Sequence, residues 1–115
     1  MNWADDDRPR EKLLIKGKGA LSDAELIAIL IASGNRDESA VDLSKRILQS
    51  LGNNLNKLAK LSVNDLMKFK GIGEAKAISI IASLELGRRR RTADVLEKEN
   101  VGGSKDAFQI LQLKL

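Results

Sequence analysis

Two glycines flank a single isoleucine at Gly71-Ile72-Gly73, directly before the most apolar helical pattern in the chain. Glycine weakens the interior of a helix or strand, so two at this spacing indicate that the backbone turns sharply or approaches another group closely. A capping pattern before the glycines predicts a short helix over residues 63–69. A helix from 74 to at least 86 is predicted by apolar residues that share one face, namely Ala77, Ile80, Ile81 and Leu84. Two helices joined by so tight a loop form a hairpin.

The rest of the chain also carries helix signals, and it shows no alternating strand pattern. Pro9 suits the first position of a helix that ends before Gly17. Ser22 predicts the start of a helix over 23–33, and Ser39 predicts one over 39–51. With the two hairpin helices, these segments predict an all-α fold, a compact five-helix bundle. Residues 53–60 are expected to form at most a short helical turn.

The composition excludes several classes of site. The chain has 115 residues, is 43% apolar, and contains neither cysteine nor histidine. A disulfide framework, a Cys/His zinc site and histidine-based catalysis are therefore excluded, and no serine has a base beside it in the pattern. We expect no enzymatic activity, no catalytic residue, no metal and no cofactor. The absence of cysteine suits a cytoplasmic location, and no apolar run is long enough to cross a membrane.

The positive charge is concentrated around the glycines. The chain carries a net charge of +4, and residues 62–91, with seven basic and three acidic side chains, account for all of it. A local excess of this kind is a better sign of an anionic partner than a global one. The segment includes the run 88–91, four consecutive arginines.

The hairpin has the features of a phosphate site. Glycines leave the loop N–H groups uncovered, and the first turn of the next helix adds free N–H groups and the positive end of its dipole. Lys70 and Lys76 lie on either side of this loop, and Arg88 and Arg90 follow on the long helix. Against this interpretation, Glu74 would repel a phosphate, and the glycines would equally suit a simple tight turn between packed helices.

The segment LMKFKGIGEAKAISIIASLELGRR resembles the helix-hairpin-helix DNA-binding motif, with matches at Leu66, Gly71-Ile72-Gly73 and Ala77. RPREKLL, ALSDAELIAILIASG and GIGEAKA also occur in the order found in the amino-terminal region of the bacterial RadC family of DNA repair proteins. The resemblance covers roughly residues 3–91. It implies a two-hairpin domain, with 9–16 and 23–33 as a degenerate first hairpin.

The resemblance also implies a domain organisation and a partner. Residues 1–91 would form the helix-hairpin-helix domain, and 104–115 the first helix of a truncated C-terminal domain. Between them, residues 92–103 are polar and end in Gly102-Gly103, a composition that predicts a linker. In the family the C-terminal domain is JAB/MPN metalloprotease-like with a zinc site built partly on histidine, and we expect this histidine-free chain to lack it. The implied partner is DNA, bound at the backbone without reading of sequence. The expected contact residues are Lys70, Gly71, Ile72, Gly73, Lys76, Arg88 and Arg90.

An alternative function stays open from the sequence. The same helices would serve as a protein-interaction module that docks the absent catalytic domain or another repair factor. In that case the glycines would be a structural turn only. The two functions differ in salt dependence, because contacts to phosphates are salt-sensitive.

Overall fold

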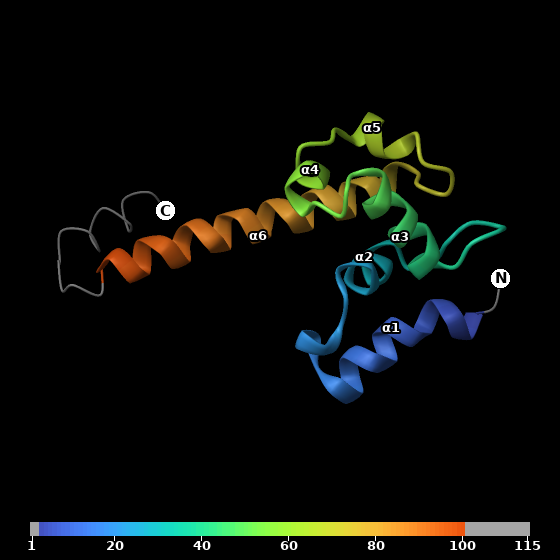
Figure 1. Cartoon of the computed structure of the whole chain (residues 1–115), viewed down its shortest axis with the longest axis horizontal. Coiled ribbons are helices and arrows are strands. Elements are labelled where there is room, and N and C mark those ends of the chain that lie inside the picture. Colours follow the sequence, from blue (N-terminus) through green and yellow to red (C-terminus); the bar gives the residue numbers. More distant parts are fainter. Residues whose placement is uncertain (1–2, 101–115) are drawn as a thin grey trace. The chain divides into compact units, whose positions relative to one another are not determined.

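A computed structural model describes residues 3–100, and every regular element in that range is a helix (Figure 1). The expected all-α fold is confirmed. The chain divides into two compact units, Met1–Ala82 and Ser83–Leu115, and each is described by itself. In chain order the helices are α1 (Trp3–Lys16), the 3₁₀ helix η1 (Lys18–Ala20), α2 (Asp23–Ile31), α3 (Ala40–Ser50), α4 (Leu55–Ala59), α5 (Val63–Met67) and α6 (Glu74–Asn100).

Serine caps fix the predicted helix starts. Ser22 and Glu25 form a capping box at α2, in which the Ser22 hydroxyl accepts from the Glu25 N–H at 3.2 Å and the Ser22 N–H donates back to the Glu25 carboxylate at 2.9 Å. Ser62 and Asp65 repeat this box at α5. Ser39 caps α3 through the Asp42 N–H at 3.1 Å. These side chains satisfy N–H groups that have no partner within the helix, which explains why sequence reasoning located the starts.

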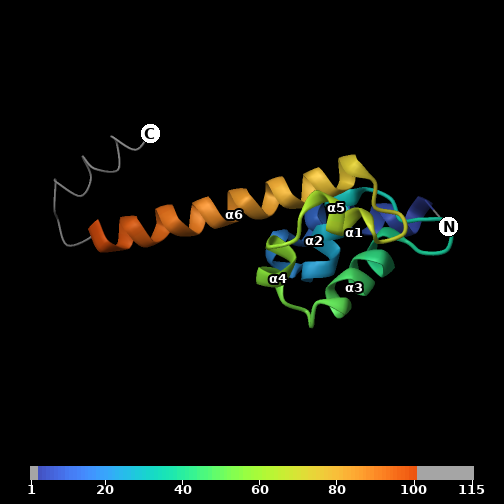
Figure 2. The same ribbon diagram turned by 90° about the horizontal axis from the view of Figure 1, so that it is seen from above.

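The core of the first unit forms where α2 packs on α3, with α1 against both, and Figures 1 and 2 show α2 beside α3. The buried side chains are almost all aliphatic. The largest come from α2, α3, α4 and the hairpin helices α5 and α6, and they are Ile31, Leu43, Ile47, Leu58, Leu66 and Ile80.

The first helix is longer than predicted. α1 begins at Trp3, so the expectation that Pro9 opens it is wrong, and Pro9 lies buried inside the helix. A proline within a helix removes one main-chain hydrogen bond. Here a tertiary contact supports the preceding turn, because the Asp6 carboxylate accepts a hydrogen bond from the Ala40 N–H at 2.8 Å. That contact joins residues 34 apart in the chain, so no local pattern reveals it.

The described residues hold six α-helices and not five, because residues 55–59 form the full element α4. The Asn54 side chain caps it by accepting from the N–H groups of Asn56 at 2.8 Å and Lys57 at 3.2 Å. Leu58 is fully buried and attaches the helix to the core. Burial of Leu58 therefore stabilises the predicted turn as a short helix.

The polar segment after Arg91, predicted to be a linker, is helical over residues 92–100. α6 continues through Asn100. The sequence from Thr92 to Asn100 contains no glycine or proline, and Asp94 and Lys98 form an i,i+4 pair at 3.9 Å. Polar composition alone is therefore compatible with a helix. The remainder of the predicted linker and the predicted helix over 104–115 lie outside the described residues, and the domain boundary at 91 stays a prediction.

None of the helices in residues 3–100 combines the length and the apolar character that a membrane span requires.

We predict that Leu43→Ala will lower the free energy of unfolding by about 2–5 kcal/mol, because the Leu43 side chain is fully buried and its removal leaves a cavity. Leu14→Ala is the matched control, since Leu14 is 83% exposed and its loss should change stability by no more than about 0.5 kcal/mol. Urea unfolding of both variants measures the difference. Similar losses in the two would contradict the packing described here.

Candidate nucleic-acid interface

The predicted hairpin between α5 and α6 forms as a tight turn. The Ile72 N–H donates to the Phe69 carbonyl at 3.0 Å, and the Ala77 N–H donates to the Gly73 carbonyl at 3.0 Å. Gly73 is therefore the N-cap position of α6. Ile72 is only 4% exposed. Leu66 and Ala77, the flanking motif positions, are fully buried.

The two glycines have different roles. Gly71 has a φ of +96°, and a Cβ built there would lie 2.9 Å from the Asn35 Cβ and 3.1 Å from a methyl carbon of Leu43. Its lack of a side chain is required by the protein's own packing. Gly73 has no positive φ, and a Cβ there would meet nothing within 4 Å. Open space at Gly73 lets another molecule approach the main chain.

The amino terminus of α6 offers hydrogen-bond donors at this opening. The first N–H groups of a helix have no partner within the helix. Within residues 3–100, no side chain accepts a hydrogen bond from the N–H groups of residues 73–76. The dipole of α6 adds partial positive charge, which Glu74 in the first turn opposes. The opening therefore suits one anionic oxygen.

Lys76 points back into the protein. Its ammonium donates to the carbonyls of Ser33 at 2.8 Å, Gly71 at 3.1 Å and Gly34 at 3.4 Å. An ammonium has three N–H donors, so these contacts use all of them. Lys76 thus joins the hairpin to the loop that follows α2. A phosphate contact by Lys76 would require exchange of these carbonyls.

Lys70 lies at the surface and pairs with a loop carboxylate. Its ammonium is 2.8 Å from the Asp37 carboxylate, and the two side chains are 68% and 65% exposed. The hydrogen bond that Lys70 donates to the Asp37 carboxylate, together with the negative charge of Asp37, raises the pKa of Lys70, so the ammonium stays charged. An exposed pair of this kind contributes little stability, about 0–1 kcal/mol, so a phosphate can replace Asp37 at small cost.

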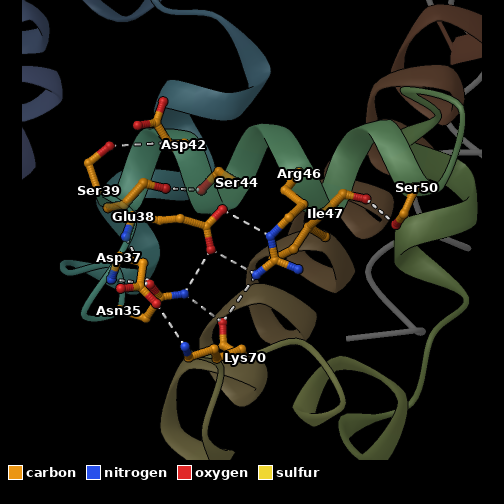
Figure 3. Close-up of polar contacts among 11 residues, drawn as sticks. Asn35, Asp37, Glu38, Ser39, Asp42, Ser44, Arg46, Ile47, Ser50 and Lys70 are labelled. Atoms are coloured by element: carbon orange, nitrogen blue, oxygen red, sulfur yellow. Dashed lines mark hydrogen bonds and ion pairs between the residues drawn. The ribbon is translucent and has the colours of Figure 1, made fainter.

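A polar network fixes the hairpin to the loop 34–38 and to α3 (Figure 3). The Asn35 amide donates to the Lys70 carbonyl at 3.1 Å and to the Glu38 carboxylate at 2.8 Å. Arg46 on α3 binds the two oxygens of Glu38 at 2.9 Å and 3.0 Å and donates to the Lys70 carbonyl at 3.3 Å. The hydrogen bonds from Arg46 and Asn35 lower the pKa of Glu38.

Sequence reasoning missed this network. It gave Asn35, Glu38 and Arg46 no role. Glu38 and Arg46 are eight positions apart, and Asn35 reaches a carbonyl 35 positions away. Neither spacing matches a local helix or turn rule. The one available signal was Asn35 itself, whose side chain closes a turn by accepting the N–H groups of Asp37 and Glu38 at 2.8 Å and 2.9 Å.

Arg88 and Arg90, the remaining predicted contact residues, lie on the part of α6 that belongs to the second unit. Arg88 and Arg89 both pair with Glu85, at 2.8 Å and 2.9 Å. Hydrogen bonds from Arg88 and then Arg89 lower the pKa of Glu85 to about 2. That Arg88 and Arg90 contact DNA together with the hairpin stays a prediction. Among residues 3–100, no cluster of three acidic, cysteine or histidine side chains is arranged to hold a metal ion.

Comparison with known proteins identifies the family. The family described as UPF0758 N-terminal matches residues 1–78. The chain belongs to this family. The match includes the hairpin and Lys76, and it ends before Arg88 and Arg90. The family assignment therefore covers the hairpin site and leaves the arginine run outside it.

Several bacterial relatives are similar over most of this chain. The UPF0758 protein of Flavobacterium johnsoniae is 65% identical over 111 residues, which cover 96% of this chain and 48% of that protein. The UPF0758 protein of Porphyromonas gingivalis is 41% identical over 106 residues, which cover 91% of this chain and 47% of that protein. The chain thus spans about half the length of the curated relatives it matches. No solved structure matches it.

We predict that alanine will destabilise the protein much more at Gly71 than at Gly73. Gly71→Ala should cost about 2 kcal/mol or more, because it combines a left-handed backbone with contacts to Asn35 and Leu43. Gly73→Ala should cost less than about 1 kcal/mol, since it only replaces one N-cap residue by a poorer one. Thermal unfolding of the two variants measures this, and equal losses would show that Gly73 is also packed.

We predict that Lys76→Met will lower the free energy of unfolding by about 1–3 kcal/mol, because it keeps the apolar stem and removes the donor to three carbonyls. Denaturant unfolding measures the loss. The salt dependence of any DNA binding should not change, since the ammonium is already engaged by three carbonyls of the protein. An unaltered stability with a shallower salt dependence would instead assign Lys76 to a phosphate.

Proposed function

We propose that this chain binds the sugar-phosphate backbone of DNA, without reading the base sequence, at the hairpin Gly71-Ile72-Gly73. The observation that carries the proposal is the open main chain at Gly73. A Cβ there would meet nothing within 4 Å, whereas Gly71 on the other side of Ile72 is closely packed. An opening on an otherwise anchored turn, at the amino terminus of a long helix, suits a phosphate oxygen.

In this proposal the main chain supplies the direct contacts. A phosphate oxygen accepts hydrogen bonds from N–H groups at Gly73 and in the first turn of α6. The exposed ammonium of Lys70 adds charge once the phosphate replaces Asp37. Main-chain donors contact phosphates in the same way at every base pair, so the binding carries no sequence information. Ile72 is buried and holds the turn in place without touching DNA.

The charges at the hairpin make this a weak site. Glu74 opposes an anion at the helix terminus, Asp37 competes for Lys70, and Lys76 is held by carbonyls. Few phosphates are therefore neutralised. Non-specific binding of this kind has a Kd of roughly 10⁻⁴ to 10⁻⁶ M at physiological salt.

The resemblance to RadC proteins extends the proposal to the longer protein. The curated relatives are about twice as long as this chain. We propose that the matching half is the DNA-contacting part of a cytoplasmic DNA repair protein, and that the other half carries the JAB/MPN-type domain implied by the resemblance. The hairpin would then place that second domain on DNA.

A second function is favoured by one observation on α1. Leu14 and Ile15 are 83% and 81% exposed, which is unusual for two adjacent large apolar side chains. Such a pair suits contact with another protein. In that case the hairpin would serve only to connect α5 and α6.

The test is a salt titration of binding to a fluorescent DNA duplex. We predict that log Kd will rise linearly with log salt, by about 0.9 for each phosphate contacted. Gly73→Ala should weaken binding several-fold without unfolding the protein, because its methyl group stands in the opening. Lys70→Ala should reduce the slope by about one contact. Ile72→Ala is the stability control, since it should lower the unfolding temperature first.

The proposal would be overturned if the folded parent chain did not bind the duplex, or bound it with no dependence on salt. Either result would favour protein docking through α1. Retention of full affinity by folded Gly73→Ala would remove the hairpin from the interface.

A further inference from the structure

We propose that Arg36 forms a second phosphate contact beside the hairpin, so that the DNA-binding surface is built from the loop 34–38 together with residues 70–73. This inference rests on the proposed function and adds a contact residue from a part of the chain outside the helix-hairpin-helix motif.

The geometry that points to Arg36 is the position of its two neighbours. The Asn35 amide donates to the Lys70 carbonyl at 3.1 Å, and the Asp37 carboxylate lies 2.8 Å from the Lys70 ammonium. Arg36 stands between them in the chain, and consecutive Cα atoms are only 3.8 Å apart. The main chain of Arg36 is thereby held against the hairpin (Figure 3 shows its two neighbours).

The loop is also held from its other side. Its Gly34 lies so close to the main chain of Glu38 and Ser39 that a Cβ would collide with them. The Gly34 and Ser33 carbonyls accept from the Lys76 ammonium. A phosphate-binding side chain on this loop therefore has a fixed base, which lowers the entropy cost of a contact.

The charge balance distinguishes Arg36 from the other cations near the hairpin. Arg46 is bound to Glu38, Lys70 to Asp37, and Lys76 to main-chain carbonyls. The Arg36 side chain is exposed, and no carboxylate in residues 3–100 lies within ion-pair distance of it. A phosphate can bind Arg36 without displacing a protein group. Its guanidinium also matches two phosphate oxygens at once, which an ammonium does not.

The two cations would act in sequence on the same strand. Arg36 attracts the backbone first, because it has no competing carboxylate. Lys70 joins when a phosphate displaces Asp37 from the exposed pair. The loop thus contributes two adjacent residues with opposite effects. Arg36 attracts the phosphate, and Asp37 competes with the phosphate for Lys70.

The test compares Arg36→Ala with Arg10→Ala in the full 115-residue chain, by anisotropy of a fluorescent duplex from 20 to about 200 mM salt. Arg10 is the control, an exposed arginine on α1. We expect Arg36→Ala to weaken binding about tenfold at about 50 mM salt and to reduce the log–log slope by about 0.9. Arg36→Lys should keep the slope, because it keeps the charge, and Arg10→Ala should behave as the parent.

Circular dichroism melts establish that each variant is folded. The inference is overturned if Arg36→Ala keeps the parent's slope and affinity while Lys70→Ala loses a contact, and the proposed hairpin function then stands. A parent chain without salt-dependent binding overturns both. Equal losses in Arg36→Ala and Arg10→Ala also overturn the inference, because they show a general charge effect and no local contact.

Discussion

The hydrogen bonds from Lys76 and Asn35 to main-chain carbonyls are the interactions on which the hairpin depends. Lys76 on α6 reaches the carbonyls at the end of α2, and Asn35 after α2 reaches the carbonyl of Lys70. Both hydrogen bonds join the hairpin to the loop after α2, and each of these two segments supplies one donor and one acceptor. Each satisfies a carbonyl that the tight loops leave without a helical partner. Together they give a glycine-containing turn a defined shape.

This anchorage explains how one motif serves both packing and binding. Gly71 and Ile72 face the protein, and the first gives close approach to Asn35 while the second fills space between helices. Gly73 alone is left open. If the turn were flexible at Gly71, ligand binding would have to order it, and the entropy cost of that ordering would lower the affinity. Here the ordering comes from the fold, so weak charge at the site is offset by a main chain that is already in place.

Local chemistry made much of the fold predictable. The capping serines, the aliphatic periodicity and the hairpin glycines identified α2, α3, α5 and the start of α6, because each signal acts within one or two helical turns. The failures share a different cause. The early start of α1 depends on Asp6 meeting α3, and the anchoring of the hairpin depends on Asn35 and Lys76 meeting distant carbonyls. The sequence predicts Lys76 as a phosphate contact but does not reveal its carbonyl partners, because every residue carries a main-chain carbonyl. The helix predicted from 74 to at least 86 continues to Asn100, because the polar residues that predicted a linker are also compatible with a helix.

The separation in sequence between the partners of these hydrogen bonds affects the order in which parts of the structure form during synthesis. The turn at Ile72 closes across three residues, whereas Lys76 and Asn35 bridge 43 and 35 residues. Short loops close quickly, and long ones carry a larger entropy cost before any contact forms. We expect the turn to form early and to gain its anchorage late, after residue 76 has left the ribosome. During synthesis the chain would therefore carry a formed but unanchored hairpin for a time.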